Sequence, residues 1–158
     1  MINKNVEKLL LKVQKPGRYV GGEKNSVIKD KSKVDLRFAF RFPDVYEVGM
    51  SHLGMKILYS LFNSKENIWC ERVFAPWIDM EELMVKNNIP LFALESGDPL
   101  TKFDFIGFTL QYELSFSKQT PPFHLLAPQL LHFWRQFNVV SELYAFLHSL
   151  IKNSLVTP

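Results

Sequence analysis

Polar and aromatic residues that could take part in chemistry gather just after the predicted strands of this sequence. Ligands of open α/β sheets bind outside the carboxyl ends of the strands, so these side chains are candidate cofactor-binding or substrate-binding residues. They offer carboxylates, an imidazole, hydroxyls and aromatic surfaces, but their spacing pairs no nucleophile with an oriented base. We therefore predict a binding rim and assign no catalytic residue. The rim consists of Asp44, Tyr46, Glu47, Ser51, His52, Trp77, Glu95, Gln111 and Glu113.

Each rim residue also has an ordinary structural interpretation. Asp44 and Ser51 are natural helix caps, and Tyr46 and Trp77 could close the core. His52 could serve as a general base. A hydrolase that uses His52 and a nearby carboxylate is nevertheless the weakest functional hypothesis, because no nucleophile accompanies them. For each residue taken alone, the structural role is favoured over the functional one.

The elements that must position the rim alternate between strands and helices. Strict alternation of apolar and polar residues predicts a strand over 34–42, with one buried and one wetter face. Further strands are predicted at 68–75, 89–94 and 104–110, and the last is nearly continuous in apolar residues, as a buried parallel strand would be.

Apolar residues at helical spacing predict helices over 2–13, between 44 and 63, and from about 79 to 87. The alternation of strands and helices predicts an α/β fold with a mainly parallel sheet and right-handed crossovers. Residues 118–158 differ, because they contain only four charged side chains. Their apolar spacing predicts a helical C-terminal tail.

Composition limits the class of protein. The 158 residues are 47% hydrophobic and 22% charged, which suits one soluble globular domain. No apolar run approaches the roughly 18–20 residues of a membrane helix, and the N-terminus lacks the apolar region of a secretory signal. We therefore predict a cytoplasmic protein without a membrane partner.

Charge is unevenly distributed along the chain. Residues 1–60 carry 12 Lys/Arg against 6 Asp/Glu. A basic first third could dock on nucleic acid or on an acidic partner. The lysines are dispersed among acids and lack an aromatic stacking platform, so a solvated surface is favoured over nucleic-acid binding.

Metal and phosphate sites lack their usual signatures. The one cysteine, Cys70, cannot form an internal disulfide, a multi-thiolate zinc site or an iron–sulfur cluster. None of the four histidines shows H-x-x-x-H spacing. The phosphate-cradling motifs G-x-G-x-x-G and G-x-x-x-x-G-K-[ST] are absent, as is D-x-H-x-x-G, which supplies a histidine to cobalt in many cobalamin proteins. We therefore expect no metal or cofactor bound by this chain alone.

Five segments, in this order, resemble one group of radical SAM proteins, whose cobalamin-binding-like N-terminal domain precedes a radical SAM core. The segments are V-Q-K-P-G-R-Y-V-G-G-E-K-N-S-V (13–27), R-F-A-F-R-F-P-D-V-Y-E-V-G-M-S-H-L-G-M-K-I-L-Y (37–59), C-E-R-V-F-A-P-W with D-M-E (70–77 and 79–81), P-L-F-A-L-E-S (90–96) and F-D-F-I-G-F-T-L-Q-Y-E-L-S (103–115). The resemblance covers about residues 13–116. It implies a Rossmann-like or flavodoxin-like half-sheet with flanking helices.

In the family resembled, a later C-x-x-x-C-x-x-C motif holds three irons of a [4Fe–4S] cluster, and the fourth iron binds S-adenosylmethionine. This sequence has no such motif, so both cofactors are implied only for the full-length family. The resemblance stops near Ser117. It implies a cobalamin-binding-like accessory domain at 1–117 and a divergent tail at 118–158, helical or disordered, which truncation or a shifted reading frame would explain.

The first hypothesis is a non-catalytic N-terminal accessory domain of a radical SAM protein, inactive alone, that covers the active site and holds a cofactor or substrate. Its partner would be the missing radical SAM core, in the same chain or a separate one. Cobalamin stays open, because the domain could keep the fold without the ligand. An incomplete sheet exposes an edge, which favours self-association. The alternative is a stand-alone small α/β ligand-binding module. In that case residues 118–158 would cover its sheet.

Overall fold

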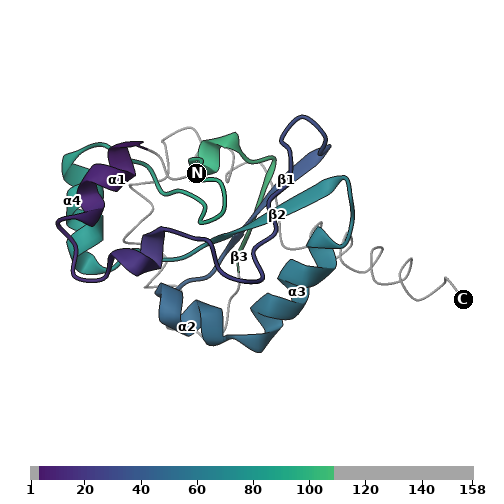
Figure 1. Cartoon of the computed structure of the whole chain (residues 1–158), viewed down its shortest axis with the longest axis horizontal. Helices are drawn as coiled ribbons and strands as arrows, with labels where there is room; N and C mark the ends of the chain where they lie inside the picture. The colour runs from purple at the N-terminus through teal and green to yellow at the C-terminus, as the bar shows by residue number, and fades with distance from the viewer. Residues whose placement is uncertain (1–3, 109–158) are drawn as a thin grey trace, which may run out of the picture. The chain divides into compact units, whose positions relative to one another are not determined.

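The computed structural model describes residues 4–108, all within one compact unit of the chain. The predicted rim residues Gln111 and Glu113 and the predicted tail at 118–158 lie outside the described residues. Figure 1 shows the elements in chain order: α1 (Lys4–Leu10), η1 (Pro16–Tyr19), β1 (Leu36–Arg41), α2 (Tyr46–Ser51), α3 (Leu53–Asn63), β2 (Ile68–Val73), α4 (Ile78–Lys86), η2 (Leu100–Lys102) and β3 (Phe105–Phe108).

The described strands form one parallel sheet in the order β2-β1-β3. At its carboxyl end, Arg41 of the central strand is in register with Val73 of β2 and Phe108 of β3. Helices flank the sheet, so the predicted α/β class is confirmed. Because all three strands run the same way, their carboxyl ends share one edge of the sheet, where the rim was predicted.

The central strand β1 is buried on both faces. Phe38 packs on Phe62 of α3, with ring centroids 4.8 Å apart. On the opposite face Ala39 and Arg41 are also fully buried, so the prediction of a wetter face was wrong. The guanidinium of Arg41 lies 5.3 Å from the ring centre of Phe108. The whole side chain of Arg41, guanidinium included, is buried, and burial lowers its pKa to about 10. A charged residue type is rarely buried, so this position carries a misleading polar signal in the sequence.

Segment 89–94 is not a strand, contrary to the prediction. The N–H of Leu94 donates to the carbonyl of Arg72 on β2 at 2.8 Å. The neighbouring N–H of Arg72, however, donates to the carboxylate of Glu95 at 2.7 Å instead of to a strand carbonyl. Pro90 has no N–H to offer to a ladder. The Glu95 side chain thus takes the place that a further strand would have beside β2.

The helical region predicted between 44 and 63 is divided at His52. This residue has extended backbone angles, and its Nδ1 accepts a hydrogen bond from the N–H of Met55 at 3.1 Å, which makes it the N-cap of α3.

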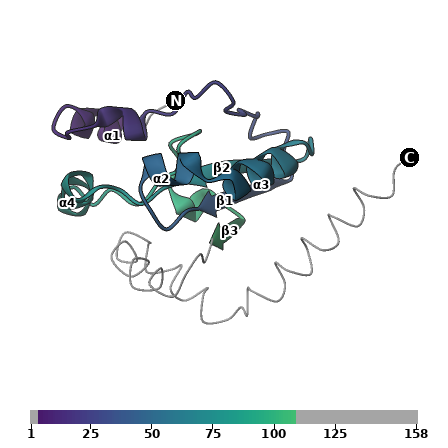
Figure 2. The same ribbon diagram turned by 90° about the horizontal axis from the view of Figure 1, so that it is seen from below.

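Helices α2 and α3 lie together along the strands (Figure 1). Helices α1 and α4 lie at the same end of the described unit in both views (Figures 1 and 2). Among residues 4–108, no helix is long and apolar enough to cross a membrane.

Candidate functional site

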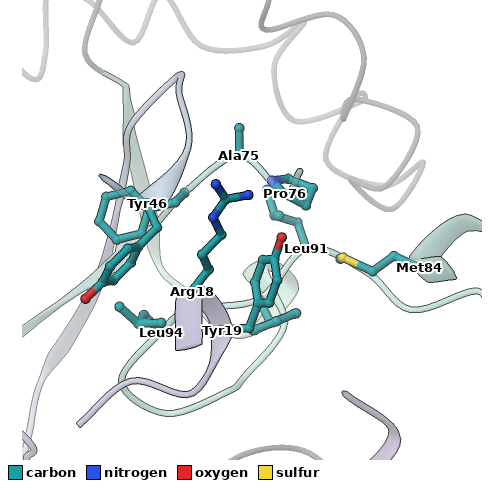
Figure 3. A pocket seen from close by; sticks show the side chains of 10 residues that line it. Arg18, Tyr19, Tyr46, Ala75, Pro76, Met84, Leu91 and Leu94 are labelled. Carbon is teal, nitrogen blue, oxygen red and sulfur yellow. The ribbon is translucent and has the colours of Figure 1, made fainter. Parts of the chain in front are cut away.

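A pocket opens where β2 ends. Its space is about 360 Å³, counting the part open to solvent. Figure 3 shows the guanidinium of Arg18 among Tyr46, Ala75 and Pro76. We call this hollow the β2 pocket; it is lined by Arg18, Tyr19, Tyr46, Phe74, Ala75, Pro76, Met84, Leu91, Phe92 and Leu94.

Short local structure carries Arg18 and Tyr19 to the pocket. Pro16 begins the η1 turn, because the fixed φ of proline suits the first position of a helix. Tyr19 is buried, and its hydroxyl accepts a hydrogen bond from the N–H of Trp77 at 3.1 Å. This bond ties η1 to the loop that follows β2, so that segments far apart in sequence form one wall.

Helix α2 supplies the opposite wall. The ring of Tyr46 meets the ring of Phe74 edge-on, with centroids 5.5 Å apart. A Cβ at Gly49 would lie 2.3 Å from a ring carbon of Phe74, so only glycine lets the helix approach this closely. Glu47 follows Tyr46 in the first turn of this helix.

Arg18, which lines the β2 pocket, forms an ion pair with Glu47. Nε of Arg18 donates to Oε1 of Glu47 at 2.9 Å, and Nη2 lies 2.9 Å from the same oxygen. Nζ of Lys15 lies 3.5 Å from this oxygen. The hydrogen bond from Arg18 holds the pKa of Glu47 below its usual value, so the group is a carboxylate at neutral pH.

Exposure and stacking distinguish the two partners. The side chain of Arg18 is 12% exposed, whereas that of Glu47 is 45% exposed. The guanidinium of Arg18 also lies 5.0 Å from the ring centre of Trp77. The arginine is therefore held by a carboxylate and an aromatic ring, while the carboxylate is open to solvent and to any ligand.

The predicted rim separates into groups. Tyr46, Glu47 and Trp77 meet around Arg18. Asp44 Oδ1 accepts a hydrogen bond from the N–H of Val45 at 2.8 Å. Ser51 Oγ donates to the carbonyl of Val48 at 2.8 Å.

Of the described rim residues, only Tyr46 lines the β2 pocket, and the others do not: Asp44, Glu47, Ser51, His52, Trp77 and Glu95. Val45 and His52 are the N-caps of α2 and α3, so neither Asp44 nor Ser51 has the capping role that its residue type suggests.

Glu95 faces inward. Its Oε1 accepts a hydrogen bond from Nε of Arg72 at 2.6 Å. Burial raises the pKa of Glu95, although the charge of Arg72 acts against this shift. We assign Glu95 a structural role, because its two carboxylate oxygens are used to hold β2.

Sequence reasoning missed Arg18 and Tyr19. It searched the residues that follow strands, and η1 precedes the first strand of the sheet. The available signal was the R-Y pair at 18–19 within the segment that resembles radical SAM proteins.

The cysteine does not fit an iron–sulfur cluster. Cys70 is the only cysteine of the sequence and is fully buried. Burial raises the pKa of its thiol, which disfavours the thiolate that a cluster needs. Among residues 4–108, no group of three or more His, Cys, Asp or Glu side chains could hold a metal ion.

Part of the chain matches a known protein family. Residues 54–126 match a family described as radical SAM proteins, N-terminal. The described part of this match runs from α3 through β2 and α4 to β3. No curated protein and no solved structure matches the chain. The chain is thus similar, over 54–126, to the N-terminal region of radical SAM proteins.

Proposed function

We propose that this chain is a non-catalytic accessory domain that works with a radical SAM core. The match of residues 54–126 to the N-terminal region of radical SAM proteins carries the proposal. The parallel sheet supports it, because the domain implied by the resemblance is an α/β half-sheet. In this proposal the core supplies the [4Fe–4S] cluster and S-adenosylmethionine, since Cys70 is the single cysteine here.

The carboxyl edge of the sheet is the part of the domain that we propose faces the core and helps to hold its substrate or cofactor. The exposed ring of Trp77 and the exposed carboxylate of Glu47 support this orientation, because both contact Arg18, which lines the β2 pocket. A cobalamin-binding-like fold, a cytoplasmic location and self-association in the absence of the core belong to the same proposal.

The test is to mix the full chain with a radical SAM core that lacks its own N-terminal region. Sedimentation should show a complex, and formation of 5′-deoxyadenosine by the core should change when the chain is present. Trp77→Ala should weaken the complex. The matched control is Ile28→Ala, because Ile28 is also an exposed apolar residue, whereas Trp77 contacts Arg18 of the β2 pocket.

Absence of a complex at tens of micromolar would contradict the proposal, as would equal weakening by both substitutions. The alternative is a stand-alone ligand-binding module. It is favoured by the fact that described residues alone form the β2 pocket. A stable monomer that binds a small ligand and ignores the core would support this alternative.

A further inference from the structure

Strand β2 lies at one edge of the described sheet and presents main-chain groups away from β1. The N–H of Phe42 donates to the carbonyl of Val73 at 2.9 Å, so Val73 faces β1. Main-chain groups alternate in direction along a strand, so those of Ile68, Cys70 and Arg72 point outward. We call the outward N–H and C=O groups of these three residues the β2 edge.

Lys29 covers one end of the β2 edge. Its Nζ donates to the carbonyl of Ile68 at 2.6 Å. The same ammonium group donates to the carbonyls of Asn63 and Lys65 at 3.0 and 2.5 Å. The N–H of Ile68 donates to the carbonyl of Lys65 at 3.4 Å. The cation therefore joins the end of α3 to the start of β2.

Asn63, the last residue of α3, covers the centre of the β2 edge. Its Nδ2 donates to the carbonyl of Cys70 at 3.0 Å, and its Oδ1 accepts from the N–H of Cys70 at 3.0 Å. A side-chain amide has the donor and acceptor of a peptide group. Asn63 thus makes the two hydrogen bonds that a residue of a neighbouring antiparallel strand would make.

Glu95 and Leu94 cover the other end of the β2 edge. The N–H of Arg72 donates to Oε2 of Glu95 at 2.7 Å, and the carbonyl of Arg72 accepts from the N–H of Leu94 at 2.8 Å. Side chains thus take part in four of the six hydrogen bonds of the β2 edge. Each outward N–H and C=O of this edge has a partner within residues 4–108.

The strand behind this edge suits pairing with a copy of itself. All six residues of β2, I-W-C-E-R-V, are buried. The uncovered edge of such a strand is a template for another chain, and natural proteins block edges of this kind. A second copy offers the same strand. A two-fold axis at Cys70 would place Ile68 of one copy opposite Arg72 of the other.

We propose that Lys29, Asn63 and Glu95 form a guard that closes the β2 edge to a strand of a second copy of this chain. Extension of the sheet at β2 requires the guard to open first. This inference goes beyond the proposed function and does not depend on a radical SAM core. Self-association of the unaltered chain must then use a surface other than the β2 edge.

Amide hydrogen exchange of the full chain, followed by NMR, tests the guard without any substitution. The amides of Cys70 and Arg72 should exchange slowly, and at the same rate at low and at high micromolar protein concentration. A rate that falls with concentration would show that a second copy pairs at the β2 edge, and would overturn the proposal. Fast exchange at both concentrations would show that the side chains do not hold these amides, and would also overturn it.

Asn63→Leu removes both hydrogen bonds to Cys70 and keeps a side chain of similar size. At low micromolar concentration the amide of Cys70 should exchange about tenfold faster, the change that a lost hydrogen bond of about 1.4 kcal/mol produces. At high micromolar concentration the exchange should slow again, and sedimentation should show a dimer. Unchanged exchange of Cys70, or a folded monomer at high concentration, would overturn the proposal.

The matched control is Asn87→Leu. Asn87 also lies at the end of a helix, and its Nδ2 donates to the carbonyl of Leu83 at 2.6 Å, away from the β2 edge. This variant should leave the exchange of Cys70 and the sedimentation unchanged.

Lys29→Met is the second variant, and it decides the matter if Asn63→Leu folds poorly. It uncovers the carbonyl of Ile68 and should produce a dimer at high micromolar concentration. Lys24→Met is its control, because Lys24 is an exposed lysine of the same segment. Equal sedimentation of the two lysine variants would overturn the role of Lys29 in the guard.

Discussion

Two arginine–glutamate pairs join distant segments of this chain in opposite surroundings. In the buried pair, Nε of Arg72 lies 2.6 Å from Oε1 of Glu95, and the side chains are 6% and 0% exposed. In the exposed pair, Arg18 and Glu47 are 2.9 Å apart and the carboxylate faces solvent. Both pairs use the same residue types, and the sequence placed both glutamates in one candidate rim.

The buried pair is surrounded by further partners. Nη2 of Arg72 donates to Oγ of Ser26 at 2.9 Å and to Oε2 of Glu23 at 3.2 Å. The ring centre of Tyr59 lies 4.5 Å from the same guanidinium. Burial and the number of partners, and not residue type, therefore separate a pair that holds the fold from a pair that remains open to a ligand.

Removing the buried arginine should have the largest effect. Arg72→Met leaves the carboxylate of Glu95 buried without its cation, which costs about 3–5 kcal/mol in the free energy of unfolding. Arg18→Met removes the exposed pair and should cost about 1 kcal/mol or less. Urea unfolding of both variants measures the difference, and equal losses would remove the distinction between the two pairs.

A side chain at Gly49 should push α2 away from Phe74 and lower the free energy of unfolding. Gly49→Ala places a methyl group 2.3 Å from the ring of Phe74, so overpacking should cost about 1–3 kcal/mol. Gly17→Ala is the control, because a Cβ there meets nothing within 4 Å. Its unfolding free energy should change by about 0.5 kcal/mol or less. If Gly49→Ala left the free energy of unfolding unchanged, α2 would not be held against Phe74.

Acid should act on the two glutamates in opposite directions. The pKa of Glu47 is lowered by the hydrogen bond from Arg18, so its contribution to stability is present above its usual pKa and is lost as pH falls through the lowered value. Burial raises the pKa of Glu95, so the folded state binds that proton more tightly and gains stability as pH falls through the raised value. NMR titration of the carboxyl carbons checks both signs. Identical titration of the two groups would contradict this assignment.

The smallest effect should come from the outer edge of the exposed pair. Lys15 is 64% exposed and 3.5 Å from Oε1 of Glu47. Lys15→Ala should change the unfolding free energy by about 0.5 kcal/mol or less, as exposed pairs do. A double-mutant cycle with Glu47→Gln measures the coupling. A coupling above about 1 kcal/mol would mean that the contact between Lys15 and Glu47 is more rigid and less exposed than the geometry indicates.

Periodicity predicted much of the fold because it follows burial directly. The strands β1, β2 and β3 and the helices around them were found in this way. It failed at segment 89–94, where Glu95 replaces a strand partner, and at β1, where Arg41 is polar yet buried. Hydrogen bonds between distant segments leave no periodic trace in the sequence.

The site was predictable only in part, for the same reason. Tyr46, Glu47 and Trp77 follow strands and could be proposed from their positions. Arg18 reaches them because η1 packs against the segment that follows β2. The hydrogen bond between Tyr19 and Trp77 shows this contact, and its two residues are 58 positions apart in the sequence. Separating Glu47 from Glu95 required burial, which residue type alone does not give.

The most direct test of this account is a pair of urea unfolding curves, for Glu95→Gln and Glu47→Gln. Both oxygens of Glu95 accept hydrogen bonds from Arg72, and the amide nitrogen of Gln cannot accept one. We therefore expect Glu95→Gln to lose about 1–3 kcal/mol in the free energy of unfolding, because a buried donor is left unpaired. We expect Glu47→Gln to lose about 1 kcal/mol or less, because the Glu47 side chain is 45% exposed. The reverse pattern, or equal loss of stability in both variants, would contradict the distinction between the buried and the exposed pair.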